Sequence, residues 1–282
     1  MGTFLHQPRL CADELLGVLR ARLLPARPQR ATTAAGIDVI GVAVTRDGAR
    51  RAWDEWRGRY GETGWWPYVT QRSPEAVAAA SRYTGVDAEA LAERMAGVVA
   101  QDHDARAASV VVSGFRWSTD CTGGGEQDLE DWRDDWDPDR LALRLGPALA
   151  DPLPGASRWV SRAWGGWGGP RWLNFVPVRG GHELPVVLPH LIGANGHGHG
   201  DRVLTPADDA ALLRRWREQW GAEVFLADGP HLELVVDRPP LDPRGAAQAA
   251  TELLGYCSDT VQDPCGVGDG MARSTMWSLW WD

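Results

Sequence analysis

The chain has 282 residues, of which 44% are hydrophobic and 24% are charged, and its formal net charge at pH 7 is −9. This composition is typical of a globular protein, and the acidic balance argues against a nucleic-acid-binding surface, which needs a basic face. No apolar run reaches the roughly 18–20 residues that span a membrane, and the N-terminus shows no secretion signal. We therefore expect a cytoplasmic protein with no membrane and no nucleic-acid partner.

All 29 basic residues are arginine, because the sequence contains no lysine. This excludes Schiff-base chemistry, a pyridoxal-phosphate linkage and a P-loop, which all need a lysine amine. Arg214, Arg215 and Arg217 cluster beside acidic neighbours, and we interpret them as a solvated helix face. The four cysteines are scattered through a long chain, so we expect reduced thiols rather than a disulfide framework. We assign no cofactor.

The first half of the chain alternates between helical and β-type patterns. We predict an N-terminal helix with its connector over residues 1–30, and a single folded unit over 31–282 with a candidate sub-boundary near 102–110. Ser73, followed by Pro74, and Asp87 are typical helix caps. The patterns predict helices over 13–24 and 47–60 and after the two caps, and strands over 37–45, 65–69 and 109–117.

The second half carries clearer signals. Thr205-Pro206 with Asp208 predicts a capping box, and the helix that follows ends at Gly221. Asp228-Gly229 predicts a hairpin turn, and Asp242-Pro243 begins another helix. Further strands are predicted over 172–178 and 184–188 and at the end of the chain.

The last strand ends in Trp277-Ser-Leu-Trp-Trp-Asp282, which places apolar residues on both of its faces. We therefore predict an α+β fold: a mixed or mainly antiparallel sheet with helices packed on one face and the C-terminal strand internal.

Several segments resemble one family when taken in order. They are Arg215-Trp-Arg-Glu-Gln-Trp-Gly-Ala222, Leu232-Glu-Leu-Val-Val236, Tyr256-Cys-Ser-Asp259 and the closing tryptophan segment. These segments resemble the bacterial domain of unknown function 4253 over residues 172–282. The resemblance implies no activity, substrate or cofactor. The chain departs from the family pattern at Cys257-Ser-Asp259, where members typically have Cys-Pro-Asp.

Candidate site residues lie around this family-like segment. Cys257, Asp259 and Gln262 follow a helix end, and with Trp280, Trp281 and Asp282 they are our binding candidates. A Trp-lined pocket is one interpretation, and a buried structural cysteine is the other. The remaining candidates are His197, His199 and Asp201, whose spacing resembles a zinc motif but lacks further ligands nearby, and Cys121, a weak candidate nucleophile.

Two functions fit these observations. The first is a non-catalytic protein-interaction module, of an immunity (toxin-neutralising) or regulatory type. It rests on the acidic balance, a carboxylate-rich segment from Glu126 to Asp139, and the 16 tryptophans, a residue type enriched at interfaces. The second is a small-molecule-binding protein or hydrolytic enzyme with a Trp-lined pocket.

Overall fold

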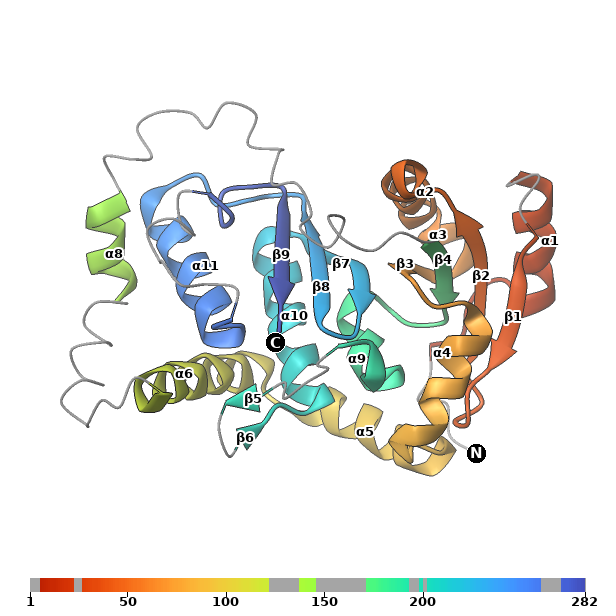
Figure 1. Ribbon diagram of the computed structural model, residues 1–282, viewed down its shortest axis with the longest axis horizontal. Coiled ribbons are helices and arrows are strands. Elements are labelled where there is room, and N and C mark those ends of the chain that lie inside the picture. The colour runs from red at the N-terminus through yellow and green to blue at the C-terminus, as the bar shows by residue number, and fades with distance from the viewer. Residues whose placement is uncertain are drawn as a thin grey trace.

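The computed structural model describes residues 6–22, 27–121, 137–145, 171–192, 198–199, 202–259 and 270–281, and the structural statements below concern these residues. The main sheet has the strand order β1-β2-β4-β3-β7-β8-β9 (Figure 1). Its strands are β1 Gln29–Thr32, β2 Asp38–Val44, β3 Trp66–Thr70, β4 Arg171–Val176, β7 Ala222–Asp228, β8 His231–Val236 and β9 Met276–Trp280, and a separate small ribbon consists of β5 Gly198–His199 and β6 Arg202–Val203.

The neighbours in the main sheet are antiparallel except for β3 and β7, which are parallel. The sheet is therefore mixed and mainly antiparallel, as predicted. The helices are α1 Ala12–Arg22, α2 Arg46–Gly58, α3 Tyr60–Thr63, α4 Pro74–Ser81, α5 Ala88–Ala100, α6 His103–Cys121, α8 Pro138–Leu145, α9 Leu184–Val187, α10 Pro206–Trp220 and α11 Pro243–Tyr256, with single 3-10 turns η1 Arg82–Thr84, η4 Gly181–Glu183 and η5 Pro189–Leu191.

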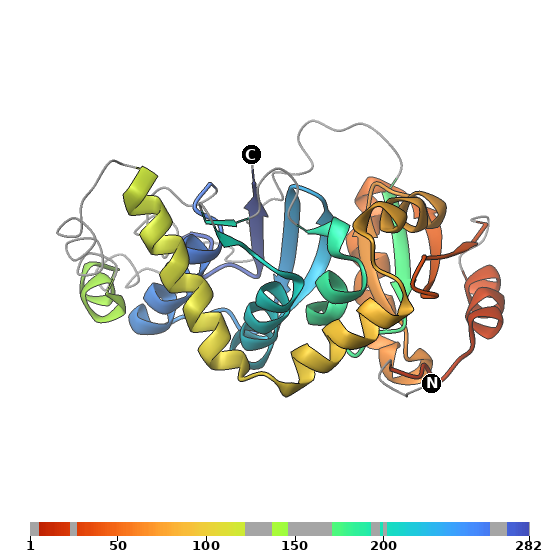
Figure 2. The same ribbon diagram turned by 90° about the horizontal axis from the view of Figure 1, so that it is seen from below.

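Helices cover both faces of the sheet, which corrects the prediction of a single covered face. Alternate residues of β8 divide between two cores: Leu232 and Leu234 join the larger one, and Val235 joins the smaller one. The larger core includes residues of α4, α5, α6, α9, α10 and α11, and Figure 2 shows α5 and α6 (yellow) running along that side. The smaller core is closed by α1 and α2. The α+β class is confirmed.

The predicted helix caps are confirmed. The side chains of Ser73, Asp87 and Asp242 each accept a hydrogen bond from a backbone N–H of the following helix. Thr205 and Asp208 form the reciprocal capping box of α10, and Gly221 ends that helix in the left-handed region at φ 65°. Local side-chain chemistry therefore fixes where these helices begin and end.

Two strand predictions were wrong. Residues 109–117 belong to α6, which Asp102 caps through the Ala105 N–H, and Ala107, Val110 and Val111 pack into the larger core at helical spacing. The run of β-branched valines favoured a strand, but contact with α10 and α11 decides the structure. The second segment, 184–188, forms the short helix α9, because Pro185 would remove a ladder N–H from a strand.

The C-terminal strand lies in the sheet, but it is not internal. Among the described residues β9 pairs only with β8, so it is the last strand in the order. Trp277 and Leu279 are nevertheless fully buried, because α10 and α11 cover their face. Apolar residues on two faces indicated burial correctly, but they carry no information about hydrogen-bonded neighbours on either side.

The division of the chain at residue 30, and the candidate sub-boundary near 102–110, stay predictions. Leu15, Leu16 and Leu19 of α1 pack in the smaller core with strand residues. None of the helices in the described part of the chain is both long and apolar enough to cross a membrane.

We predict that Trp277→Ala destabilises the fold by about 3–5 kcal/mol, because it removes a fully buried indole from a packed core. The indole makes edge-on contacts with Trp216 and Trp220 at centroid distances of 5.4 and 5.2 Å. Trp280 is 39% exposed on the opposite face, so Trp280→Ala should cost only about 1 kcal/mol. Urea denaturation of both variants measures the difference, and equal losses would contradict this account.

Candidate functional site

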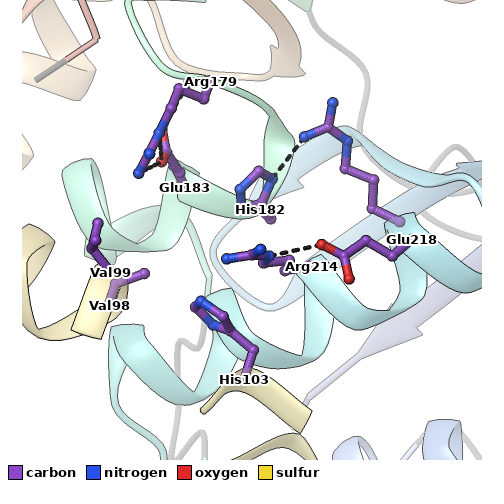
Figure 3. Close-up of a pocket in the computed structure, with 9 residues that line it drawn as sticks. Val98, Val99, His103, Arg179, His182, Glu183, Arg214 and Glu218 are labelled. Atoms are coloured by element: carbon purple, nitrogen blue, oxygen red, sulfur yellow. Dashed lines mark hydrogen bonds and ion pairs between the residues drawn. The ribbon is translucent and has the colours of Figure 1, made fainter. Parts of the chain in front are cut away.

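A pocket of about 380 Å³ lies where α5, α6, the η4 segment and α10 meet (Figure 3). Most of its lining is charged or titratable, although the larger core lies directly beneath it. A concave site with convergent polar groups is the usual place for a ligand. Its lining residues are Val98, Val99, His103, Arg179, His182, Glu183, Arg214, Arg217 and Glu218.

Helix α10 supplies three of these side chains. Arg217 and Glu218 follow Arg214 by three and four residues, so both lie near it on the helix surface. The Arg214 Nε donates to Glu218 Oε1 at 2.8 Å. The side chains of Arg214 and Arg217 are 42% and 36% exposed, so the predicted solvated helix face also forms part of the pocket lining. The third member, Arg215, forms ion pairs with Glu252 and Asp104 outside the pocket.

The segment from Arg179 to Glu183 forms the facing wall. The Glu183 carboxylate is 1% exposed and accepts hydrogen bonds from the Arg179 backbone N–H at 2.7 Å and from its Nε at 2.6 Å. Gly180 lies against α10, because a Cβ at this position would stand 2.7 Å from an Arg217 nitrogen. The close backbone approach is at the next residue, Gly181, where a Cβ would stand 2.9 Å from the Val224 backbone nitrogen of β7.

Arg217 connects the pocket to a buried carboxylate. Its Nε lies 2.7 Å from Glu223 Oε1 on β7, and an NH1 hydrogen points to His182 Nδ1 at 3.4 Å. The Trp66 ring lies 5.9 Å from the guanidinium carbon. These contacts hold Arg217 in one position at the floor of the pocket.

Both histidines of the pocket are neutral near pH 7. Burial and, next, the charge of Arg217 lower the pKa of His182 to about 3. Burial also lowers the pKa of His103. A guanidinium only donates, so His182 Nδ1 is the acceptor and its proton resides on Nε2. In Figure 3 this second ring nitrogen of His182 faces the space between Glu183 and Arg214.

The balance of charge in the pocket is positive. Arg179, Arg214 and Arg217 face two lining carboxylates, Glu183 and Glu218, which leaves one net positive charge. Burial raises the pKa of Glu223, behind Arg217, to about 7 although Arg217 and Arg57 act in the opposite direction. This carboxyl is therefore partly protonated near neutral pH and only partly offsets Arg217.

The binding candidates predicted around Cys257 do not form a pocket with these residues. Cys257 is buried, and its Sγ donates to the Trp280 backbone oxygen at 3.1 Å, which agrees with the structural interpretation. Trp281 is buried and packs edge-on against Tyr256. Asp259 lies on the surface. Gln262 and Asp282 lie outside the described residues.

The candidate metal ligands are also outside the part of the chain that can be described in detail. His197 and Asp201 fall in undescribed segments, and of His199 only the backbone, in β5, is described. Among the described side chains no group of three or more His, Cys, Asp or Glu residues could hold a metal ion. Cys121 is the last residue of α6, and its side chain is not described.

Sequence reasoning missed the pocket because its lining comes from three separate segments. Each Arg–Glu pair, read alone, is typical of a solvated surface. The one local signal was the dipeptide Gly180-Gly181 directly before His182 and Glu183, which indicates a close backbone approach beside titratable groups.

We predict that Glu223→Gln stabilises the protein increasingly as pH rises. The folded carboxyl, with a pKa near 7 against an ordinary value of 4.5, retains its proton between these values while the unfolded chain releases it. The free energy of unfolding of the wild type therefore falls across that window, and the variant lacks this term. The difference between the two proteins should grow by about 1–3 kcal/mol from pH 5 to pH 8.

Urea denaturation at pH 5, 6, 7 and 8 measures this difference, and Glu218→Gln is the matched control. Glu218 lines the same pocket but its side chain is 65% exposed, so that variant should show no such trend. His182 destabilises the fold at low pH in all three proteins, so its contribution cancels. A difference for Glu223→Gln that is constant with pH would show that this carboxyl is ionised throughout.

The family model of DUF4253, a domain of unknown function, matches residues 175–282. No curated protein and no solved structure matches the chain significantly. The matched segment contains Arg179, His182, Glu183 and the pocket residues of α10, whereas Val98, Val99 and His103 precede it. From residue 175 onward the chain is thus similar to DUF4253, as its sequence predicted.

Proposed function

We propose that the protein binds a small anionic molecule, carrying a carboxylate or phosphate group, in the pocket between α10 and the η4 segment. The observation that carries the proposal is the convergence of three guanidinium groups on one cavity of about 380 Å³. Guanidinium groups present planar forks of N–H donors that match carboxylate and phosphate oxygens.

The state of each arginine supports this assignment. Arg217 is fixed by Glu223 and His182, and it provides a rigid positive floor. The side chains of Arg179 and Arg214 are 50% and 42% exposed, so both remain accessible to a ligand. Each is paired through only some of its N–H groups, because a guanidinium has five donors. An anion can therefore be bound without breaking the existing pairs.

The apolar wall indicates what else the ligand contains. Val99 is 58% exposed at the end of α5, and Val98, which is buried, lines the pocket beside it. A ligand that joins an anionic group to a short apolar group would cover Val99 while its charge meets the arginines. Burying that valine surface would add to the binding free energy.

Binding suits this pocket better than catalysis. No serine, threonine or cysteine lines it in the described part of the chain, and the sequence has no lysine, so a nucleophile is missing there. With a pKa of about 3, His182 is a weak base near neutral pH. The pocket therefore supports the small-molecule-binding interpretation without its tryptophan lining and without its hydrolytic part.

A cytoplasmic protein-interaction module of the immunity or regulatory type stays a prediction, as does a protein partner. Its acidic segment lies almost wholly outside the described residues, which include only 137–139 of it. The surface tryptophans it would use are also few in the described part, where Trp53, Trp56, Trp216 and Trp277 are fully buried. The pocket therefore has more support.

We predict that Arg214→Gln weakens binding of small anions at least tenfold, about 1.4 kcal/mol, because it removes an accessible guanidinium from the pocket. Isothermal titration calorimetry with inorganic phosphate, acetate and butyrate at constant ionic strength provides the measurement. Butyrate should bind more tightly than acetate if Val99 contributes.

Arg50→Gln is the matched control. Arg50 also pairs with a carboxylate four residues on, at 2.9 Å, and its side chain is 39% exposed, but it lies on α2 away from the pocket. This variant should bind as the wild type does. Absence of saturable binding to any of the three anions, or equal weakening by both substitutions, would refute the proposal.

A further inference from the structure

We propose a second, independent site: the cavity between α5, α6 and the start of α10 binds a tetrahedral oxyanion, of which the phosphate group is the representative class. This cavity measures about 340 Å³. Val98 lines both cavities, and the other residues of the second cavity are absent from the first. Its polar lining residues are Arg94, Gln101, Arg106 and Thr205.

Arg94 of α5 lines this cavity and carries a buried donor that has no acceptor in the described segments. Its NH1 nitrogen has almost no solvent-accessible surface and no hydrogen-bond partner within the described part of the chain. A desolvated guanidinium N–H without an acceptor costs free energy, and native proteins leave few such groups. No carboxylate pairs with Arg94 among the described residues, so its positive charge favours an anion in the cavity that it lines.

Arg106 of α6 is held in place by three hydrogen bonds. Its Nε donates to Asp208 Oδ1 at 2.9 Å, its NH1 to Gln101 Oε1 at 2.8 Å and its NH2 to Thr205 Oγ1 at 3.0 Å. A guanidinium carries five N–H groups, so two are left for a ligand. Because the side chain is already ordered, binding would cost little additional side-chain entropy.

The N-terminus of α10 adds positive electrostatic potential to that of Arg94 on α5 and Arg106 on α6. Ala207 lines the cavity at the second helical position, where backbone N–H groups lack an intrahelical acceptor. Asp208, which is 3% exposed, accepts from Arg106 and caps the helix, so it offsets only one of the two arginines. Donors from three elements suit oxygens that point in several directions, as in a tetrahedral anion rather than a planar carboxylate.

The experiment uses the full chain and inorganic phosphate. Calorimetric titration at constant ionic strength is done on Arg214→Gln, in which the pocket at η4 is weakened, and on the double variant Arg214→Gln with Arg94→Gln. We expect the first protein to retain saturable phosphate binding and the double variant to bind at least tenfold more weakly. Adding Arg94→Lys instead should recover part of the affinity, because it restores charge without the planar fork.

Arg51→Gln, on the exposed surface of α2, is the control for a general loss of positive charge and should leave the affinity unchanged. Loss of phosphate binding in Arg214→Gln alone, or equal binding with and without Arg94, would overturn the second site. The two proposals can fail separately. If wild type and Arg214→Gln bind phosphate equally, and Arg94→Gln weakens binding in both, then phosphate binds at the second site and not in the pocket at η4.

Discussion

The rest of the structure depends on the burial of one face of α10. Trp216 and Trp220 are buried against Trp277 of β9, and the Trp216 Nε1 donates to Glu252 Oε2 of α11 at 2.8 Å. These contacts fix the rotation of the helix about its own axis. Since successive residues turn by about 100°, fixing the tryptophans also fixes the direction of Arg214 and Arg217. The aromatic core thus positions the charged pocket.

Holding Arg217 in the pocket costs free energy, because its partner Glu223 is buried. The capping box and Gly221 fix the ends of α10, so Arg217 is directed to the start of β7, where Glu223 is buried. Taking a carboxylate out of water is unfavourable, and its raised pKa expresses that cost. What the fold gains is a guanidinium held by Glu223 and His182, beside Gly181, which lies against the backbone of β7. A fixed donor loses less entropy on binding than a mobile one.

The sequence predicted the elements whose ends are set by local chemistry, such as the caps at Ser73, Asp87 and Thr205 and the hairpin at Gly229. The predictions were wrong where contacts between residues distant in sequence determine the local structure. Residues 109–117 form a helix because α6 crosses α11 at Gly114, where a Cβ would lie 1.8 Å from the Gly255 oxygen. Likewise, the pocket joins His103 to Arg214, which is 111 positions further along the chain, and no local pattern reports that these residues are close in space.

The binding candidates around Cys257 stay predictions, because the structure describes only part of that group. A polar group near a helix end is chemically suggestive, but Cys257 donates to the backbone of Trp280 and so links α11 to β9. The thiol belongs to the same aromatic assembly that orients α10. Cys257 therefore contributes to the scaffold, and arginines on a solvated helix face also line the candidate site.

Under the proposed function, two parts of the chain contribute differently to the ligand specificity of the pocket. The segment similar to DUF4253 supplies the arginines, His182 and both carboxylates, whereas the preceding part of the chain supplies the valine wall and His103. Charge selects a class of anion, and the shape of an apolar wall discriminates between members of that class by about 1–3 kcal/mol for each methylene group. A chain with the same C-terminal segment but a different N-terminal half would therefore retain the preference for anions and select a different apolar group.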